Sequence, residues 1–99
     1  MRRTPVMIDQ KDPWRMLADA IVLQAVKDYR SRIRLMKRIR KQMHKRDISK
    51  EEKEYLELRY RKYEDLQDAE ADFFFSDLFA TLTDLDGYDL LDRLNKEAK

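Results

Sequence analysis

Between Pro13 and Gly87 the chain contains neither glycine nor proline, the two residues that most often end a helix or form a turn. Strands joined by tight turns need such residues, so a β-sheet is not expected. Apolar residues recur instead at steps of three, four and seven, which is the spacing along one face of an α-helix. They are Val22, Val26, Tyr29, Ile33, Met36 and Met43. The sequence therefore predicts an all-α fold.

The first helix is predicted to run from Pro13 to about residue 45. Asp12 suits the N-cap position, and proline suits the first helical position, where it loses no hydrogen bond. A polar break follows, and Ser49 with Glu52 three residues later is a capping box that starts a second helix. Because the connection is short, the two helices should form a long antiparallel hairpin. One side of the second helix carries Leu56, Tyr60, Tyr63, Leu66, Ala69 and Phe73.

The last quarter of the chain is expected to form two short helices. Ser76 suits the N-cap of a helix over residues 77–83, and Asp86 suits the N-cap of a helix over residues 88–97. Both should pack on the base of the hairpin, which is the end away from its connecting loop. The inward residues of the last helix would be Leu90, Leu91 and Leu94.

The main core is predicted at this base. Residues 73–82 carry more apolar side chains than one helix face can hold, so we expect them to pack against Trp14, Leu17 and Ile21. A chain of 99 residues can bury one modest core, so residues 12–99 are predicted to form a single helical domain. Residues 1–11 precede the first cap and are expected to be a flexible N-terminal arm.

Charge is distributed unevenly along the chain, whose net charge is +2. Residues 1–50 hold 15 basic and 5 acidic residues, a net of +10, and residues 51–99 hold 7 basic and 15 acidic residues, a net of −8. Such asymmetry indicates a polyanionic partner, self-association or an internal electrostatic match. The predicted partner- or nucleic-acid-binding residues lie off the apolar stripe of the first helix and are Arg30, Arg34, Lys37, Arg38, Lys41 and Lys45.

A solvated helix face explains the same bases, because Lys and Arg favour the C-terminal end of a helix. No base-reading motif is present, so sequence-specific DNA recognition is not expected. The acidic half offers another docking face, suited to a basic groove on a second protein. Its residues are Glu64, Asp65, Asp68 and Asp72.

The residue types that catalysis needs are missing or badly spaced. There is no cysteine, and His44 is the only histidine, with no nucleophile or acid at a readable spacing. The aspartates around Gly87 resemble a calcium loop but lack the ligand spacing of an EF-hand. No enzymatic activity, cofactor or metal site is therefore expected.

The apolar runs are only a few residues long, whereas a membrane-spanning helix needs about 20 apolar residues. No membrane partner is expected, and the composition fits a cytoplasmic protein. The first helix offers a seam for a homodimer, but Arg40 interrupts its apolar stripe. A homodimer and a monomer therefore both stay open.

Two segments of the chain resemble known proteins. They are ADAIVLQAVKDYR over residues 18–30, and FFFSDLFATLTDLDG over residues 73–87 with Leu90 and Leu91. Together they resemble a group of short phage and prophage proteins of Gram-positive bacteria, which pair an AIVxxAVxDYR helix with an FFxSxxFxxLTDxDG segment. The basic middle segment lies outside the likeness. The resemblance implies a mobile-element origin and a place in the host-cell cytoplasm, and it brings no catalytic residue with it.

Short phage proteins often bind and block host enzymes, including defence nucleases. The predicted function is therefore that of a small phage-encoded interaction protein that binds a host or phage macromolecule, a protein in preference to nucleic acid. An inhibitor of the anti-CRISPR type fits this description. The alternative is a sequence-nonspecific nucleic-acid-binding accessory protein of phage replication or packaging.

Overall fold

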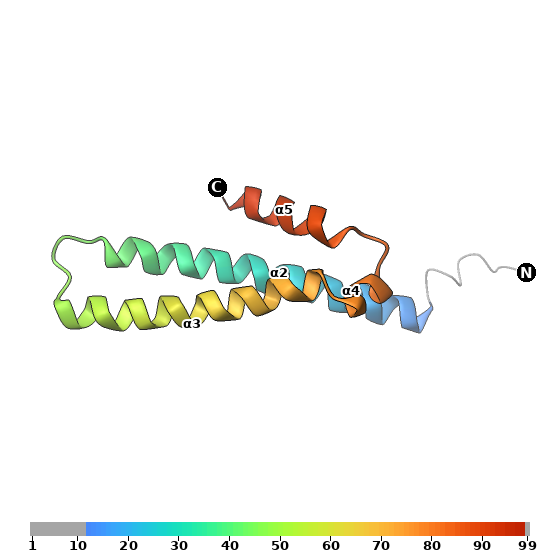
Figure 1. The fold of residues 1–99 in the computed structure, drawn as a ribbon, viewed down its shortest axis with the longest axis horizontal. Coiled ribbons are helices and arrows are strands. Elements are labelled where there is room, and N and C mark those ends of the chain that lie inside the picture. The colour runs from blue at the N-terminus through green and yellow to red at the C-terminus, as the bar shows by residue number, and fades with distance from the viewer. Residues whose placement is uncertain (1–11, 99) are drawn as a thin grey trace, which may run out of the picture.

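The computed structural model describes residues 12–98, which form helices and no strand. Two long helices run antiparallel as a hairpin, and two short ones pack toward the base (Figure 1). The molecule is 69 Å long and only 23 by 21 Å across. The predicted all-α hairpin is confirmed, while the expected arm, residues 1–11, lies outside the described residues. In chain order the helices are α2 (Pro13–Met43), α3 (Lys50–Phe74), α4 (Asp77–Leu82) and α5 (Gly87–Glu97).

The helix starts are set by local chemistry, as the sequence predicted. At each start a side-chain oxygen accepts a hydrogen bond from a backbone N–H two or three residues later, at 2.9 to 3.3 Å. These bonds satisfy amides that have no partner inside the helix. α2 ends at Met43, two residues before the predicted position, and His44 is its exposed C-cap. The N-cap residues are Asp12, Ser49, Ser76 and Asp86.

The main core lies at the base, where all four helices meet. Phe74 at the end of α3 packs edge-on against Tyr29 and Phe79, with ring centroids 5.9 and 5.5 Å apart. Leu94 of α5 is buried in the same cluster, and Leu90 and Leu91 pack against it, as expected. The other buried members of the cluster are Ala18, Val22, Val26 and Leu82.

The expected burial of Trp14, Leu17 and Ile21 in the main core is wrong. Trp14 and Leu17 are each 54% exposed, and Ile21 is exposed as well. The cluster instead buries Ala18 and Val22, which lie one residue round the helix, roughly 100° away from Leu17 and Ile21. α4 has only six residues and covers one side of α2, so the neighbouring side stays in solvent.

The predicted apolar face of α3 is correct near the loop and at Phe73, which packs against the main core, and wrong at Leu66 and Ala69. Leu66 and Ala69 are exposed, while Glu70 is half-buried and Phe74 is buried. Glu70 instead pairs with Arg32 of α2, whose side chain is only 22% exposed and donates to the Glu70 carboxylate at 3.3 and 3.4 Å. The pair neutralises two charges that are both shielded from water, which explains why an acidic residue is tolerated on this face.

A second, smaller buried group holds the hairpin near its loop. It consists of Met36 and Ile39 of α2 and Leu56 of α3. Arg40, which the sequence analysis placed in the stripe, is exposed and donates a hydrogen bond to the Tyr60 hydroxyl. Ile39 takes its place in the interface and is 1% exposed, so the stripe continues without an interruption.

Gly87, the single glycine, allows a close backbone approach between α5 and α3. A Cβ at this position would overlap the carbonyl oxygen of Phe74 and touch the Phe79 ring. Any larger residue would push the start of α5 away from the core.

Candidate functional site

Four of the predicted cations form an exposed row along the outer side of α2, which we call the basic ridge. All four are exposed, and none forms an ion pair with a carboxylate of residues 12–98. They lie on the side of α2 away from its residues buried against α3, on the half of the helix toward the loop. Their positive charge is therefore available to a partner. The basic ridge consists of Arg34, Lys37, Arg38 and Lys41.

Two predicted cations are placed elsewhere. Arg30 donates two hydrogen bonds to the Glu97 carboxylate, at 2.9 and 2.7 Å, and so ties α2 to the end of α5. This hydrogen bonding holds the pKa of Glu97 below its ordinary value. Lys45 lies beyond the end of α2, in the loop. The acids that open α3, Glu51 and Glu52, pair with no cation of the basic ridge.

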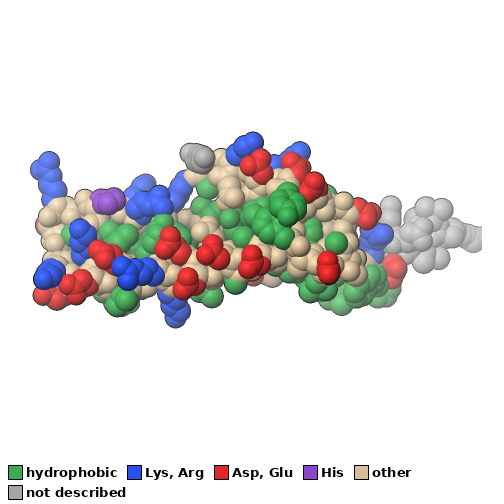
Figure 2. All heavy atoms as spheres, viewed as in Figure 1, with side chains coloured by type: hydrophobic (Ala, Val, Ile, Leu, Met, Phe, Trp, Pro, Cys, Tyr) green, Lys and Arg blue, Asp and Glu red, His purple; other side chains and the backbone are tan. Residues whose placement is uncertain are grey.

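The predicted acidic residues form a second exposed row, on the outer side of α3. None of them pairs with a cation within the described part of the chain. Figure 2 shows acidic side chains following α3 across the face in view. Asp65, Asp68 and Asp72 point away from Leu56 and Phe74, the residues that α3 buries, so these three lie on the side of the hairpin opposite the basic ridge, while Glu64 lies on the flank of α3. This acidic ridge consists of Glu64, Asp65, Asp68 and Asp72.

Sequence reasoning missed an exposed apolar surface at the base. Large apolar side chains are exposed on more than one side of the first three turns of α2, and Figure 2 shows hydrophobic side chains gathered where α2 begins and α4 lies. The signal was present in the sequence, because this segment has more apolar residues than a single stripe requires. Patches of this kind often mark contact surfaces. This apolar end consists of Trp14, Met16, Leu17, Ile21 and Leu23.

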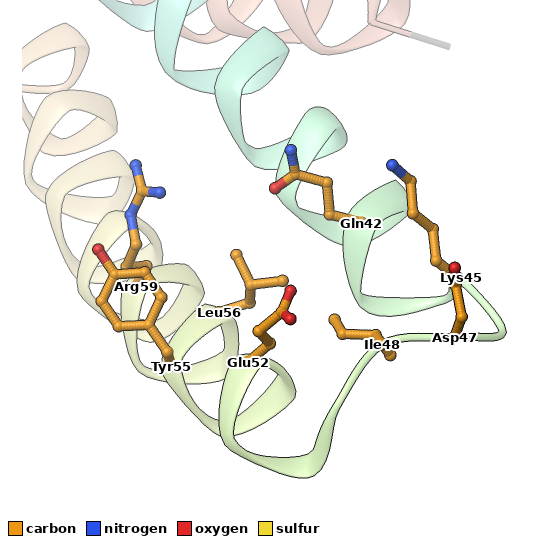
Figure 3. Close-up of a pocket in the computed structure, with 8 residues that line it drawn as sticks. All are labelled: Gln42, Lys45, Asp47, Ile48, Glu52, Tyr55, Leu56 and Arg59. Carbon is orange, nitrogen blue, oxygen red and sulfur yellow. The ribbon is translucent and has the colours of Figure 1, made fainter.

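A depression of about 520 Å³ lies at the loop end, between the end of α2 and the start of α3 (Figure 3). Ile48 and Leu56 contribute apolar surface, and Lys45 and Arg59 are balanced by Asp47 and Glu52. Arg59 also donates to the Tyr63 hydroxyl at 3.3 Å, which lowers the pKa of Tyr63. Because its charges cancel, the depression does not select an anion or a cation.

No group of three or more His, Asp or Glu side chains within residues 12–98 is arranged to hold a metal ion. Asp86, part of the calcium-like sequence, caps α5 through two backbone amides, as the capping pattern predicted. The described helices include none that is long and apolar enough to cross a membrane. Comparisons of the chain with protein-family models, curated proteins and solved structures gave no match.

Proposed function

We propose that the chain is a small phage-encoded interaction protein that inhibits a host defence nuclease of the anti-CRISPR type, by placing its acidic ridge in the enzyme's nucleic-acid groove. The observation that carries the proposal is the spacing of the acidic ridge. From Glu64 to Asp72, four exposed carboxylates span about 12 Å of helix, or about one charge per 4 Å. A strand of B-DNA carries about one charge per 3.4 Å of its axis. The line of negative charge on the acidic ridge is therefore similar in spacing to that of a DNA strand, and a groove that binds nucleic acid could bind the ridge instead.

The rest of the molecule supports this mode of binding. The carboxylates stand on one continuous helix, so little conformational freedom is lost when they are aligned in a groove. The resemblance to phage and prophage proteins, carried by residues 18–30 and 73–87, supports the proposal, because short phage proteins often block host enzymes. Surface ion pairs contribute little affinity individually. The exposed apolar end adds apolar surface that can be buried against the partner.

An interference assay tests the proposal. Bacteria with an active CRISPR nuclease are transformed with a targeted plasmid, with and without the chain. We expect the chain to restore transformants, and the triple variant Asp65→Lys, Asp68→Lys, Asp72→Lys to abolish the effect. With the purified nuclease, the chain should compete with target DNA for binding.

The matched control changes net charge equally but leaves the acidic ridge intact. Asp19→Lys, Asp28→Lys and Asp92→Lys are exposed and scattered over α2 and α5. This variant should keep its inhibitory effect. Equal loss in both variants would show that only net charge matters, and no inhibition of any defence nuclease by the wild-type chain would refute the proposal.

The second candidate function is sequence-nonspecific nucleic-acid binding, and the basic ridge is the observation that favours it. Four cations without carboxylate partners are free to contact phosphates. If all four do so, the logarithm of affinity for duplex DNA should fall by about 3 to 4 for each tenfold rise in salt. Arg34→Glu, Arg38→Glu and Lys41→Glu should abolish this binding, while Lys50→Glu, Lys53→Glu and Lys62→Glu should not.

A further inference from the structure

The two charged ridges match each other in spacing. Arg34, Arg38 and Lys41 of the basic ridge follow one another at steps of four and three residues. Carboxylates of the acidic ridge show the same two steps when they are read toward the N-terminus. Two such helices laid antiparallel would bring three opposite charges face to face in one register. The matching carboxylates are, in that order, Asp72, Asp68 and Asp65.

The two ridges of one molecule cannot meet, because they lie on opposite sides of its hairpin. The basic ridge points away from α3, and the acidic ridge points away from α2. Only another molecule can bring them together. We propose that a second copy of this chain lays the acidic ridge of its α3 antiparallel on the basic ridge of α2.

The apolar residues beyond the ridges support the same alignment. The row on α2 continues toward its N-terminus, at helical spacing, into Leu23 and Met16, which are both exposed. The row on α3 continues past Asp72 into Phe75, which is 43% exposed and lies 4.3 Å from the Tyr88 ring, centroid to centroid. In this antiparallel register Phe75 lies opposite Ser31, at the same end of the paired charges as Leu23 and Met16, which lie further along α2. The charges fix the register, and the apolar side chains flank them at one end.

This contact joins two different surfaces, so it does not close between two copies. Each molecule in a pair still presents one unused ridge, and a third copy can add at either end. The expected assembly is therefore a head-to-tail series of oligomers that grows with protein concentration. It should weaken with salt, because its ion pairs are exposed.

The experiment is sedimentation of the purified full chain over a hundredfold range of concentration, at about 0.05 M and about 0.5 M NaCl, where screening differs strongly. Three variants are compared with the wild type. One reverses the basic ridge (Arg34→Glu, Arg38→Glu, Lys41→Glu), one reverses the acidic ridge (Asp65→Lys, Asp68→Lys, Asp72→Lys), and one carries both sets. Circular dichroism checks that each variant keeps its helices.

We expect the wild type to form larger species at low salt. Each single-ridge variant should self-associate at least about tenfold more weakly, since every attraction becomes a repulsion. An equimolar mixture of the two should assemble again, and so should the variant with both sets. If a triple variant does not fold, the single variants Arg38→Glu and Asp68→Lys test the same contact through one charge pair.

A wild-type chain that stays monomeric at every concentration and salt would overturn the proposal. Self-association that none of the variants changes would overturn it too, because the contact would then lie on the apolar end. So would a mixture that fails to assemble although each folded variant alone has lost self-association. The result is independent of the proposed function, since it is obtained with the purified chain and no nuclease.

Discussion

Tyr29 donates its hydroxyl hydrogen to Asn95 Oδ1 at 2.8 Å, which joins the middle of α2 to a residue of α5 that lies 66 positions later in the chain. The ring of Tyr29 is buried, and its edge meets Phe74. Tyr29→Phe keeps the ring and removes the hydrogen bond, so we expect the free energy of unfolding to fall by about 0.5–1.5 kcal/mol. Urea denaturation measures this. An unchanged midpoint would mean that the bond contributes nothing to the docking of α5.

The same tyrosine should make stability depend on pH in the alkaline range. Burial raises the pKa of Tyr29 above its ordinary value of 10.0. The folded state therefore holds this proton more tightly than the unfolded chain does. The stability that results is complete below pH 10.0 and is lost as pH rises through the higher folded pKa.

Denaturation at several alkaline pH values should show this loss in the wild type and a smaller loss in Tyr29→Phe. Tyr63→Phe is the control of opposite sign. A hydrogen bond from Arg59 lowers the pKa of Tyr63. The contribution of Tyr63 to the free energy of unfolding therefore grows as its hydroxyl ionises. Replacing Tyr63 should therefore make the alkaline loss larger, and equal slopes in all three proteins would contradict the assignment.

Phe79 and Phe75 should differ sharply, although both belong to the same phenylalanine-rich segment. Phe79 is buried among Phe73, Phe74 and Leu82, and Phe79→Ala should cost about 3–5 kcal/mol. Phe75→Ala should cost less than half as much, because Phe75 is 43% exposed whereas Phe79 is 2% exposed. Thermal unfolding of both variants is the measurement. Similar losses would show that Phe75 is buried in solution, as it would be inside an assembly.

Gly87 is the position least able to accept a side chain. Gly87→Ala places a methyl group on the backbone of Phe74, and α5 must shift to relieve the overlap. We expect a loss of about 1–3 kcal/mol, the usual range for overpacking. Asp86→Ala, which removes only the cap beside it, should cost about 1 kcal/mol. A stabilised Gly87→Ala protein would contradict the close approach described above.

The loop half of the hairpin depends on few side chains. Ile39→Ala removes the most buried of them and should cost about 2–5 kcal/mol, whereas Arg40→Ala removes only an exposed hydrogen bond to Tyr60 and should cost about 0.5–1.5 kcal/mol. Hydrogen exchange should show faster exchange near residues 36–56 in Ile39→Ala than at the base. Uniform acceleration along the whole chain would mean that the hairpin opens only as one unit.

The sequence predicted what local chemistry decides. The N-caps at Asp12, Ser49, Ser76 and Asp86 each depend on a few neighbouring residues, and all four are present. The exposure of the basic and acidic ridges also follows from helical spacing. Which helix packs against a given face could not be predicted in this way, because it depends on residues far away in the chain.

The errors illustrate this limit. Trp14 and Leu17 look like core residues until one knows that the short α4 covers only the side of α2 with Ala18 and Val22. Arg30 looks like part of the basic row until Glu97, 67 positions later, is seen to take both of its hydrogen bonds. Periodicity identifies a face, but only the tertiary fold decides what covers it.

The Arg32–Glu70 pair also restricts how the two long helices can be aligned along their axes. Its side chains are only 22% and 23% exposed, so separating them would leave a poorly hydrated charge. A hairpin slid by one helical turn, about 5.4 Å, would separate this pair. Arg32→Leu with Glu70→Leu should therefore keep its stability yet show duplicated backbone resonances, one set for each alignment. The wild-type pair thus disfavours sliding, because its two half-buried charges can meet in only one alignment of the helices.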